Sequence, residues 1–556
     1  MNSGKHGAKM WTGKSDLVPF PLPPCKHLSK KTMITLLDYG AGNVRSVINA
    51  IERLGETVKL VNSGADIDRA ERLVFPGVGN FGALMRTLRE KDLRDPLIRY
   101  LHSGKPFFGI CVALQALFES SEEAPEEPGL GILPGRVQRF TTDLAIPHIG
   151  WNGLKAHQAS PLFHGLQGNE KFYFVHSFHV QPATQDDILT TTDYGYEFVS
   201  AIQKGNMVAT QFHPEKSGRA GLKLLENFLA GDREAARPVA CPQTTVLAKR
   251  IIACLDVRAN DRGDLVVTKG DQYDVREEGS VRNLGKPVTL AGEYYEQGAD
   301  EITFLNITAF RDFPLQDMPM LEVLQQTSKN VFVPLTIGGG IRDFTDRDGR
   351  FYSALEVASQ YFRSGADKVS IGSDAVLIVE EVLRTGKATG LSSIEQIARV
   401  YGNQAVVISI DPRRVYVASP DAVKHKVIET VTPGPNGEQY CWYQCTIKGG
   451  REGREVDAVT LAQVCEQLGA GEILLNCIDK DGTNSGFDLE LITAVRSAVT
   501  IPVIASSGAG NAEHFREVFT QTRAEAALAA GIFHRKEVPI SAVKKHLSAT
   551  VEIRPV

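Results

Sequence analysis

The second half of the chain contains an internal repeat, which limits the possible folds more than any other feature of the sequence. The stretch TLAGEYYEQGADEITFLNIT at 289–308 returns as TLAQVCEQLGAGEILLNCID at 460–479, and IIACLD at 251–256 returns as VVISID at 406–411. Each copy predicts four short apolar strands with helices between them, so two copies predict eight strands. Eight strand–helix units in about 300 residues are typical of a closed (β/α)8 barrel. An open doubly wound sheet is the alternative, but it gives no reason for a two-fold repeat.

The remaining sequence divides into three further regions, because 556 residues are too many for one ordinary core. Residues 1–31 are rich in lysine and proline without hydrophobic periodicity, so we expect a disordered extension or an organelle transit peptide. Alternating strands and helices predict an α/β domain over 32–232. The stretch 233–246 lacks periodicity and is interpreted as a linker. The barrel domain then covers 247–556.

Composition excludes several classes of partner. A formal net charge of −5 without a basic stripe argues against nucleic acid, and no run of about 18 apolar residues predicts a membrane span. Eight cysteines in so long a chain do not form a disulfide framework, so we expect the cytoplasm, or a plastid if residues 1–31 are a transit peptide. Cys441 and Cys445 lack a second ligand pair, and DKDGTN lacks the ligand order of a calcium loop. We therefore expect no metal and no cofactor.

A cysteine lies at a predicted strand–helix junction in FGICVALQALF, residues 108–118. We expect the strand to end at Gly109 and the helix to start directly after Cys111. Such a turn would expose the sulfur near backbone N–H groups and the positive end of the helix, which favours the nucleophilic thiolate. A lone cysteine is more often a small buried residue. A nucleophile therefore needs a base and an orienting group elsewhere in the domain.

His213 and Glu215 supply such a pair in MVATQFHPEKSG. His213 ends an apolar strand, and Pro214 favours an extended conformation for it. If the run stays extended, the two side chains share one face about 6–7 Å apart, and the carboxylate can orient the imidazole. Gly77 and Gly79 follow another apolar strand in LVFPGVGNFG, where backbone N–H groups can stabilise an oxyanion. A structural histidine and a plain turn are the alternatives.

Taken in this order, the stretches resemble a class I glutamine amidotransferase domain. The resemblance implies that Cys111 attacks the side-chain amide of glutamine, that His213 transfers protons and that Glu215 orients His213. The products would be glutamate and ammonia, formed by way of a glutamyl thioester. PHIGWN at 147–152 and FYFVHSFHV at 172–180 narrow the resemblance to the glutaminase of the imidazole glycerol phosphate synthase family.

Two residues of the cysteine elbow bear on that resemblance. Gln115, four residues after the cysteine, matches a glutamine-binding position of the family. Ala113 departs from the family pattern, which has glycine two residues after the nucleophile. Glycine there permits close approach and unusual backbone angles. Because alanine adds only one methyl group, we expect slower or shifted glutaminase activity at most.

The repeat also places one carboxylate of each half at the same mouth of the barrel. Asp256 ends IIACLD and Asp411 ends VVISID, and residues at the C-terminal ends of barrel strands face the active site. Two acids in unlike surroundings can serve as general acid and general base, although each could instead cap a following loop. Glycine-rich turns after the strands of both copies offer N–H groups to phosphate, which predicts a substrate with a phosphate at each end. These turns contain Gly339, Gly340 and Ser373 in the first copy, and Ser507, Gly508, Ala530 and Gly531 in the second.

The barrel region resembles the cyclase of the same family in stretches such as TIGGGIRD, GADKVSIGS and GEILLNCIDKDGTNSGFD. The resemblance implies that the barrel adds ammonia to a bis-phosphorylated ribulosyl formimino nucleotide. Ring closure and cleavage would yield imidazole glycerol phosphate, for L-histidine biosynthesis, and an aminoimidazole carboxamide ribotide. Asp256 and Asp411 would be the acid–base pair. Further substrate contacts are expected from Lys269 in the first strand–helix loop and from Asn306, Asn476, Asp481 and Gly482 near the strand ends.

Four charged residues each precede or open a predicted barrel strand, which places them at the opposite, N-terminal mouth. They are Arg250, Glu301, Lys368 and Glu472. A surface ring of ion pairs, worth little to stability, is the alternative. Since the family docks its glutaminase against this face, we expect the four residues to form a gate through which ammonia enters the barrel. With both parts fused, we expect a monomer that binds only small-molecule substrates.

Two rival functions stay open at this point. The barrel could sense a phosphorylated metabolite without cyclising it, with the glutaminase as a scaffold. The glutaminase could instead feed a different acceptor, as in pyridoxal phosphate or anthranilate synthesis. The predicted triad and both strand-end aspartates argue against the sensor. Pyridoxal phosphate synthesis would want a Schiff-base lysine at a strand end, whereas Lys269 lies in a loop; anthranilate synthesis needs a different acceptor domain.

Overall fold

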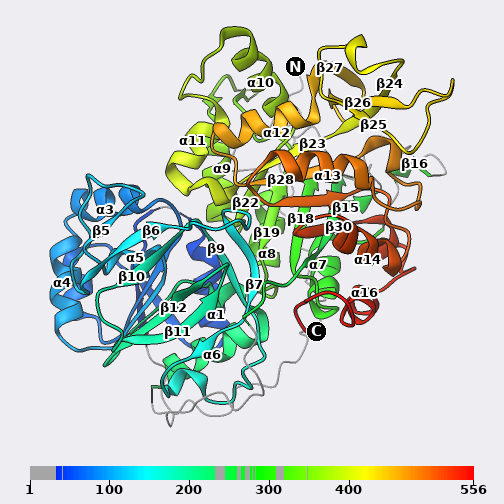
Figure 1. Cartoon of the computed structure of the whole chain (residues 1–556). Coiled ribbons are helices and arrows are strands. Elements are labelled where there is room, and N and C mark those ends of the chain that lie inside the picture. Colours follow the sequence, from blue (N-terminus) through cyan, green and yellow to red (C-terminus); the bar gives the residue numbers. More distant parts are fainter. Residues whose placement is uncertain are drawn as a thin grey trace, which may run out of the picture.

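The structure is a computed structural model in two parts, which lie side by side in Figure 1. It describes residues 33–40, 42–231, 245–259, 265–268, 276–277, 280–281, 284–307, 319–346 and 348–556. The predicted extension at 1–31, Lys269 and most of the predicted linker lie outside these residues. No helix of the described part is long and apolar enough to cross a membrane.

The N-terminal part is built on a mixed sheet of eleven strands, in the order β2-β1-β3-β4-β13-β12-β10-β6-β5, with β11 on β12 and β8 on β11. The strands of this sheet are β1 (Met33–Leu36), β2 (Thr57–Leu60), β3 (Leu73–Gly77), β4 (Phe107–Cys111), β5 (Ser120–Ser121), β6 (Gly135–Arg139), β8 (Lys155–Ala156), β10 (Phe178–Pro182), β11 (Ile188–Asp193), β12 (Glu197–Lys204) and β13 (Met207–Thr210). A separate antiparallel pair is formed by β7 (His148–Asn152) and β9 (Phe172–His176). The helices are α1 (Val44–Arg53), α2 (Gly64–Arg69), α3 (Phe81–Glu90), α4 (Arg94–His102), α5 (Val112–Ala116) and α6 (Gly218–Ala230), with 3-10 turns at Pro161–Phe163 and Pro214–Lys216.

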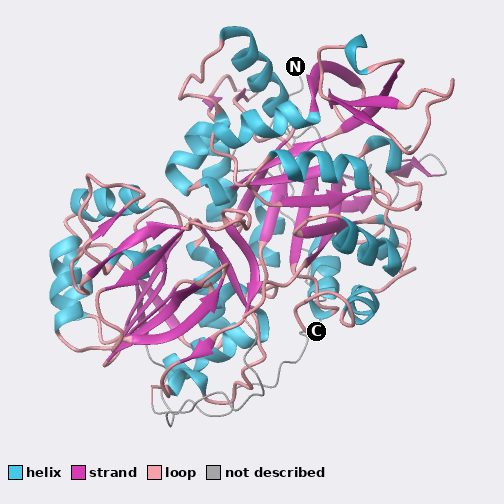
Figure 2. Ribbon diagram, viewed as in Figure 1, coloured by secondary structure: helices cyan, strands magenta, loops and turns pink. Residues whose placement is uncertain are grey.

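The C-terminal part is a closed barrel, because its first strand pairs in parallel with both the second and the last. Its eight parallel strands are β14 (Arg250–Ala259), β18 (Glu301–Asn306), β19 (Leu335–Gly338), β22 (Lys368–Ile371), β23 (Val406–Ile410), β28 (Glu472–Asn476), β29 (Val503–Ser506) and β30 (Ala526–Ala529). The helices around it are α7 (Pro287–Glu296), α8 (Pro319–Thr327), α9 (Ala354–Arg363), α10 (Ser373–Thr385), α11 (Ser393–Tyr401), α12 (Ala458–Gln467), α13 (Leu489–Ala498), α14 (Ala512–Gln521), α15 (Gly531–His534) and α16 (Ile540–Leu547). Figure 2 shows these helices outside the ring of strands, so the predicted fold class is confirmed.

Short accessory strands complete the barrel part. They are β15 (Leu265–Thr268), β16 (Arg276–Glu277), β17 (Ser280–Val281), β20 (Phe344–Thr345) and β21 (Phe351–Tyr352). A four-stranded antiparallel sheet follows β23 and is made of β24 (Pro412–Val417), β25 (Val427–Glu429), β26 (Tyr440–Ile447) and β27 (Glu452–Asp457). Arg414 ties this inserted sheet to α13, because its guanidinium binds both carboxylate oxygens of Asp488 at 2.8 and 2.9 Å.

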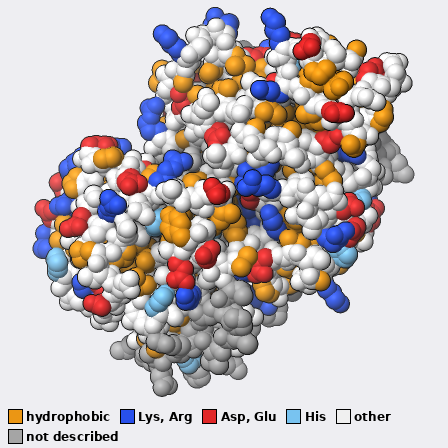
Figure 3. All heavy atoms as spheres, in the orientation of Figure 1, with side chains coloured by type: hydrophobic (Ala, Val, Ile, Leu, Met, Phe, Trp, Pro, Cys, Tyr) orange, Lys and Arg blue, Asp and Glu red, His pale blue; other side chains and the backbone are white. Residues whose placement is uncertain are grey.

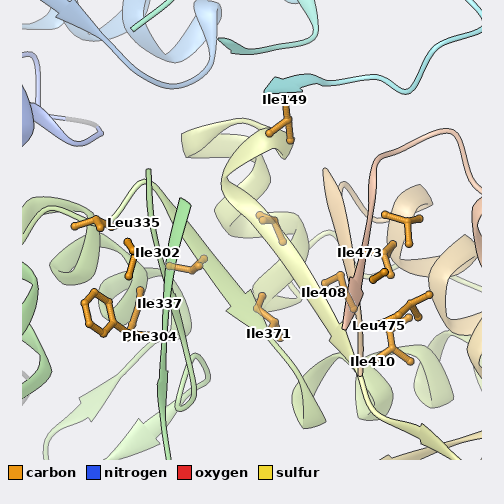
Figure 4. Packing of buried hydrophobic residues seen from close by; sticks show 14 of the residues in the cluster. Ile149, Ile302, Phe304, Leu335, Ile337, Ile371, Ile408, Ile410, Ile473 and Leu475 are labelled. Atoms are coloured by element: carbon orange, nitrogen blue, oxygen red, sulfur yellow. The ribbon is translucent and has the colours of Figure 1, made fainter. Parts of the chain in front are cut away.

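The main core lies between the barrel strands and the surrounding helices (Figure 4). Every second residue of the strands points into it, as the two-residue period of a strand requires. Examples from successive strands are Ile302, Ile337, Ile371, Ile408 and Ile473, all fully buried. Burying such a side chain contributes about 1.5–3 kcal/mol. Ile149 of β7 joins the same cluster, so the core is continuous across the junction of the two parts.

The N-terminal part docks on the N-terminal ends of the barrel strands. Asn43 donates from Nδ2 to Asp367 Oδ1 at 2.8 Å, and the Lys216 ammonium pairs with the other oxygen of that carboxylate at 2.6 Å. Trp151 donates from its indole nitrogen to the Asp300 carbonyl at 3.1 Å. Asp300 and Asp367 each directly precede a barrel strand. On the face drawn in Figure 3, acidic and basic side chains are interspersed over both parts.

Candidate active sites

Cys111 ends β4 in a strained conformation, with φ +55° and ψ −108°, and α5 starts at the next residue. The expected end of the strand at Gly109 is wrong by two residues. The expected exposure of the sulfur is also wrong, because Cys111 is only 6% exposed. The strain is typical of a nucleophile elbow. Gly77 packs against this elbow so closely that a Cβ there would lie 2.5 Å from the amide nitrogen of Ala113, which only glycine avoids.

His213 and Glu215 form the base and its orienting group, but not by extended geometry. The chain turns into a 3-10 helix at Pro214, so the expectation that the run stays extended is wrong beyond His213, and His213 Nδ1 lies 2.8 Å from Glu215 Oε1. His213 itself is extended (φ −99°, ψ 97°), as Pro214 requires. Burial opposes the imidazolium, but the Glu215 carboxylate and a Cys111 thiolate raise the pKa of His213 to about 10. Its Nε2 atom is buried without a hydrogen-bond partner in the described part of the chain, which leaves it available to the thiol.

Gln211, which was not predicted from the sequence, connects the cysteine to Gln115. Its Nε2 lies 3.4 Å from Cys111 Sγ, and its Oε1 accepts a hydrogen bond from Gln115 Nε2 at 3.1 Å. Gln115 also donates to the Phe178 carbonyl at 3.0 Å. Both glutamines are buried, so their amides are held by one another. Gln211 could have been found in the sequence as a polar residue at the end of an apolar strand, two positions before His213.

A hollow of about 280 Å³ lies at the junction of the two parts, next to this network. Phe178, whose carbonyl binds Gln115, is on its wall together with Glu123 and Arg139 of the N-terminal part. Gly402, Asn403, Glu466 and Thr500 of the barrel part close the other side. Burial raises the pKa of Glu123, and the Phe81 amide donates to its carboxylate at 2.8 Å. The hollow thus offers the acids Glu123 and Glu466 and the base Arg139 to an amphoteric molecule, and none of the three was predicted from the sequence.

The four residues predicted at the N-terminal mouth meet in one closed ring of ion pairs. Lys368 Nζ lies 2.7 Å from Glu301 and 2.6 Å from Glu472. Arg250 contacts the same two carboxylates, at 2.9 Å for Glu301. All four open their strands and all are fully buried, so the alternative of an exposed surface ring is wrong. The two positive and two negative groups give the ring no net charge, and each buried charge has an opposite partner, as burial of charge requires.

Tyr173 of the N-terminal part reaches this ring and was not predicted. Its backbone carbonyl accepts the N–H of His213 at 2.9 Å, and its side chain is 1% exposed. Burial and the Glu301 carboxylate raise the pKa of the Tyr173 phenol. The hydroxyl has no hydrogen-bond partner among the described residues. Tyr173 therefore connects the strand end that carries the base with the mouth of the barrel.

The other mouth of the barrel contains a cavity of about 440 Å³. Asp256 and Asp411 lie on its wall with Asn476, Asp481 and Gly482, and so do all four predicted residues of the second glycine-rich set, Ser507, Gly508, Ala530 and Gly531. Asn476 donates to Asp411 Oδ1 at 2.9 Å. Burial raises the pKa of Asp411 and outweighs this hydrogen bond, which lowers it. Ala530 follows β30 as the N-cap residue of α15, and Gly531 begins that helix.

The predicted turn residues of the first repeat copy, Gly339, Gly340 and Ser373, are called here the first glycine-rich set, and they do not lie on the wall of that cavity. Asn306 ends β18, and Gly339 and Gly340 follow β19 with φ of +93° and +78°. Ser373 begins α10, two residues after the end of β22. Its hydroxyl accepts the backbone N–H of Lys448, in the inserted sheet, at 3.1 Å. The turn after β26 thus contacts Ser373 through Lys448 and the cavity through Gly449 and Gly450.

No cluster of three or more histidine, cysteine or acidic residues suited to a metal ion occurs within the described ranges. Cys441 and Cys445, the closest pair in the sequence, are separate buried thiols.

Comparisons with known proteins agree with this division of the chain. The family model "Glutamine amidotransferase class-I" matches residues 35–231, and "Histidine biosynthesis protein" matches residues 250–539. The chain is 59% identical over 531 residues to imidazole glycerol phosphate synthase hisHF, chloroplastic, of Arabidopsis thaliana, covering 94% of this chain and 90% of the relative. It is 55% identical to imidazole glycerol phosphate synthase hisHF of Schizosaccharomyces pombe, covering 93% and 98%. Its first part alone is 47% identical over 200 residues to imidazole glycerol phosphate synthase subunit HisH 1 of Methanococcus maripaludis, covering 35% and 98%.

Proposed function

The chain belongs to the imidazole glycerol phosphate synthase family and carries both the glutamine amidotransferase and the cyclase domain of that enzyme, and from this premise we propose how its residues divide the work. The enzyme acts on small-molecule substrates in histidine biosynthesis with two sites in one chain. Ammonia released from glutamine at Cys111 passes through the barrel to Asp256 and Asp411.

At the first site, the Cys111 thiolate attacks the amide carbon of glutamine. N–H groups of the turn at Gly77 and Gly79 stabilise the oxyanion of the tetrahedral intermediate, and His213 gives its proton to the leaving ammonia. The product of this half-reaction is a glutamyl thioester. Water then attacks the thioester with His213 as base, which releases glutamate and restores the thiol. The 2.8 Å contact of His213 with Glu215 and the free Nε2 atom support these roles.

The hollow between the two domains receives the α-amino acid end of glutamine. Glu123 would bind the α-ammonium group and Arg139 the α-carboxylate, because ion pairs of this kind fix both ends of a zwitterion. The side-chain amide then points along Phe178 and Gln115 toward the sulfur. Since Asn403 and Thr500 also line the hollow, both domains contribute to it.

The barrel interior supplies a route from the ring to the second site. One face of β14 runs from the ring to the cavity that holds Asp256 and Asp411, over about 20 Å. Its residues, at alternate positions, are Arg250, Ile252, Cys254 and Asp256. The interior between the two ends contains an apolar cluster of Ile252, Cys254, Val407, Leu474, Ile504, Ala526 and Leu528, and the uncharged hydroxyls of Thr303, Thr336, Ser370 and Ser409 share the same face. Neutral ammonia crosses such a layer more easily than ammonium, because burial penalises charge. The ring gates this route.

At the second site, Asp256 and Asp411 serve as base and acid during addition of ammonia, ring closure and cleavage. Burial favours the protonated form of Asp411, which suits the acid. Ser507, Gly508, Ala530 and Gly531 bind one phosphate of the substrate through their turns. Gly339, Gly340 and Ser373 bind the other. Asn306, Asn476, Asp481, Gly482 and Lys269 complete the substrate contacts.

The observation that carries this proposal is that the triad and the paired aspartates lie at the two ends of one barrel with a buried ring between them. The test is to supply the ribulosyl formimino nucleotide with glutamine or with ammonium salt. The unmodified chain is expected to cyclise it from either source, and Cys111→Ala from ammonium only. Cys441→Ala, in the inserted sheet, is the control and is expected to use both. Failure of the unmodified chain with both sources would overturn the proposal.

The sensor alternative lacks support, because the named relatives are synthases along nearly their whole length. The relative from Arabidopsis thaliana is named chloroplastic, which supports a plastid location over the cytoplasm for this chain. One chain contains both domains, and we propose a monomer.

A further inference from the structure

The turn between β26 and β27 of the inserted sheet lies at the mouth of the barrel, and no function has been assigned to it so far. Lys448, Gly449 and Gly450 follow β26 with φ of +59°, +67° and +82°, three consecutive residues in the left-handed region. Gly449 and Gly450 lie on the wall of the cavity that holds Asp256 and Asp411. A backbone in this conformation is costly for lysine, and such strain is frequent where a turn has a function.

The same turn contacts Ser373, which starts α10. The Lys448 N–H donates to Ser373 Oγ at 3.1 Å, so the turn connects the first glycine-rich set with the cavity. Ser373 itself is not on the cavity wall, whereas Gly449 and Gly450 of the turn are. A substrate that extends from Asp256 to Ser373 therefore passes Gly449 and Gly450.

The charges around the cavity call for a cation at this end. Asp256, Asp411 and Asp481 are on its wall, and a phosphate group adds about two further negative charges. Arg535 lies at the opposite end, next to Gly531, where Glu537 holds its guanidinium at 2.7 Å. At the Ser373 end, the Lys448 side chain is 68% exposed and pairs with Glu452 at 2.7 Å. An exposed ion pair of this kind is weak and is readily exchanged for a phosphate.

We propose that Lys448 binds the substrate phosphate at the first glycine-rich set, together with Ser373 and the backbone N–H groups of Gly449 and Gly450. Its ammonium moves from Glu452 to the phosphate, and the turn closes one end of the substrate site. The inserted sheet thereby determines specificity for a substrate with two phosphates. The inference rests on the proposed placement of one phosphate at each end of the cavity.

The test measures cyclisation with ammonium salt, so that the glutaminase does not enter. Lys448→Met is expected to raise KM for the bis-phosphorylated nucleotide about tenfold, as the loss of one charge-assisted contact does, with kcat within twofold. Lys448→Arg keeps the charge and is expected to restore KM to within threefold. Lys424→Met removes an exposed lysine elsewhere in the inserted sheet and is the matched control. An unchanged KM in Lys448→Met, or an equal rise in Lys424→Met, would overturn the inference.

The two products give a second measurement, since imidazole glycerol phosphate and the aminoimidazole carboxamide ribotide carry one phosphate each. Lys448→Met is expected to weaken competitive inhibition by only one of them, about tenfold. Equal weakening of both would indicate a diffuse effect of charge and contradict a site.

Glu452→Gln separates the role of the lysine from the integrity of the turn. It releases the ammonium and is expected to leave KM unchanged or to lower it. A rise in KM like that of Lys448→Met would mean that the ion pair only holds the turn in place. The unmodified chain is measured first, because its failure to cyclise would defeat the proposed function itself, and this inference with it.

Discussion

The two candidate sites of this chain are built on opposite plans. The thiol site is enclosed: Cys111, His213 and Glu215 are each no more than 6% exposed, and all three come from one domain within two short segments. The cyclase site is an open cavity whose two aspartates come from different halves of an internal repeat. Its walls also include a turn from the inserted sheet.

The difference reflects what each reaction needs. Cleavage of an amide by a thiolate depends on precise short contacts, so a strained elbow and a 2.8 Å imidazole–carboxylate pair are suitable. Cyclisation of a large bis-phosphorylated substrate needs room and separate contacts for its two ends. The ring of Arg250, Glu301, Lys368 and Glu472 separates the two environments. Substitutions should therefore affect glutamate release and cyclisation independently at the two sites and together only at the ring.

Asp411→Asn is expected to give the largest difference between loss of cyclisation and loss of glutamate release. The amide cannot transfer the proton that a buried carboxyl group with a raised pKa supplies, so cyclisation should fall by about 10²–10⁴-fold. The loss should be the same with glutamine or ammonium salt, while glutamate release continues. Asp421→Asn, on an exposed residue of the inserted sheet, is the control. Loss of glutamate release to the same degree as cyclisation would show that the two sites are not independent.

At the ring of ion pairs, a single substitution is expected to affect both the supply of ammonia and the stability of the chain. Lys368→Met leaves Arg250 as the one cation of the ring for Glu301 and Glu472, and breaking a buried ion pair in this way costs about 3–5 kcal/mol of the free energy of unfolding. Glutamine-dependent cyclisation should fall about tenfold more than ammonium-dependent cyclisation, because the barrel entrance changes shape. Denaturant unfolding and the two cyclisation assays measure both effects.

Lys329→Met, an exposed lysine next to the same mouth, is the control for the ring variant. A Lys368→Met enzyme with both cyclisation rates unchanged would refute the gate.

The sequence predicted the barrel well, for a physical reason. A two-fold repeat fixes the number of strands, and the period of a strand fixes which residues face inward, so the positions of Asp256, Asp411 and the four ring residues followed from their places in the strands. Burial of the ring did not follow, because it depends on the docked domain. Tyr173, Glu123 and Arg139 were missed for the same reason: each acts across a junction, and no local pattern in the sequence encodes a contact between domains.

Local geometry at the thiol site was predicted less accurately. The spacing of His213 and Glu215 suggested an extended pair, but Pro214 starts a 3-10 turn that brings their atoms to 2.8 Å. The strand before Cys111 continues two residues beyond Gly109, since the cysteine itself takes the left-handed conformation. Both errors arise where tertiary contacts override local preference.

The two domains should also differ in their response to acid. The glutaminase domain buries three histidines, His148, His176 and His179, in one aromatic cluster. Burial lowers the pKa of His176 to about 3 and that of His179 to about 4. It also lowers the pKa of His148 well below its usual value. The barrel has His534, with a pKa of about 4. These groups are neutral when folded but take up protons near pH 6.5 when unfolded. The contribution of these four histidines to stability is therefore complete above pH 6.5 and falls as the pH drops toward 4, by about 1.4 kcal/mol per pH unit for each histidine.

Glutamate release should consequently be lost at a higher pH than ammonium-dependent cyclisation. Thermal unfolding between pH 7 and pH 5 measures the slope. His148→Phe, which keeps an aromatic ring between Phe174 and Tyr194, should reduce the slope by about one proton, whereas the exposed His102→Gln should not change it. Equal acid sensitivity of both activities would contradict the expected difference.

The smallest effect is expected at Ala113, where the family pattern has glycine. The left-handed residue of the elbow is Cys111, and Ala113 already lies inside α5 with its methyl group fully buried. Glycine would therefore use none of its conformational freedom there. The close approach at the elbow is instead provided by Gly77, which faces the Ala113 amide nitrogen. Ala113→Gly should lower the free energy of unfolding by about 0.5–1 kcal/mol and leave kcat/KM for glutamine within threefold.

Glutaminase turnover with and without a cyclase ligand measures this, and Ala116→Gly at the end of the same helix is the matched control for the cost of glycine. A gain of tenfold or more in Ala113→Gly alone would mean that the methyl group restrains the elbow. The enclosed site would then be tuned by the residue behind the nucleophile and not only by the contacts of His213 and Glu215. A similar small loss in both variants would indicate that the elbow obtains its shape from Gly77 and the strain at Cys111, so alanine and glycine are equivalent at position 113.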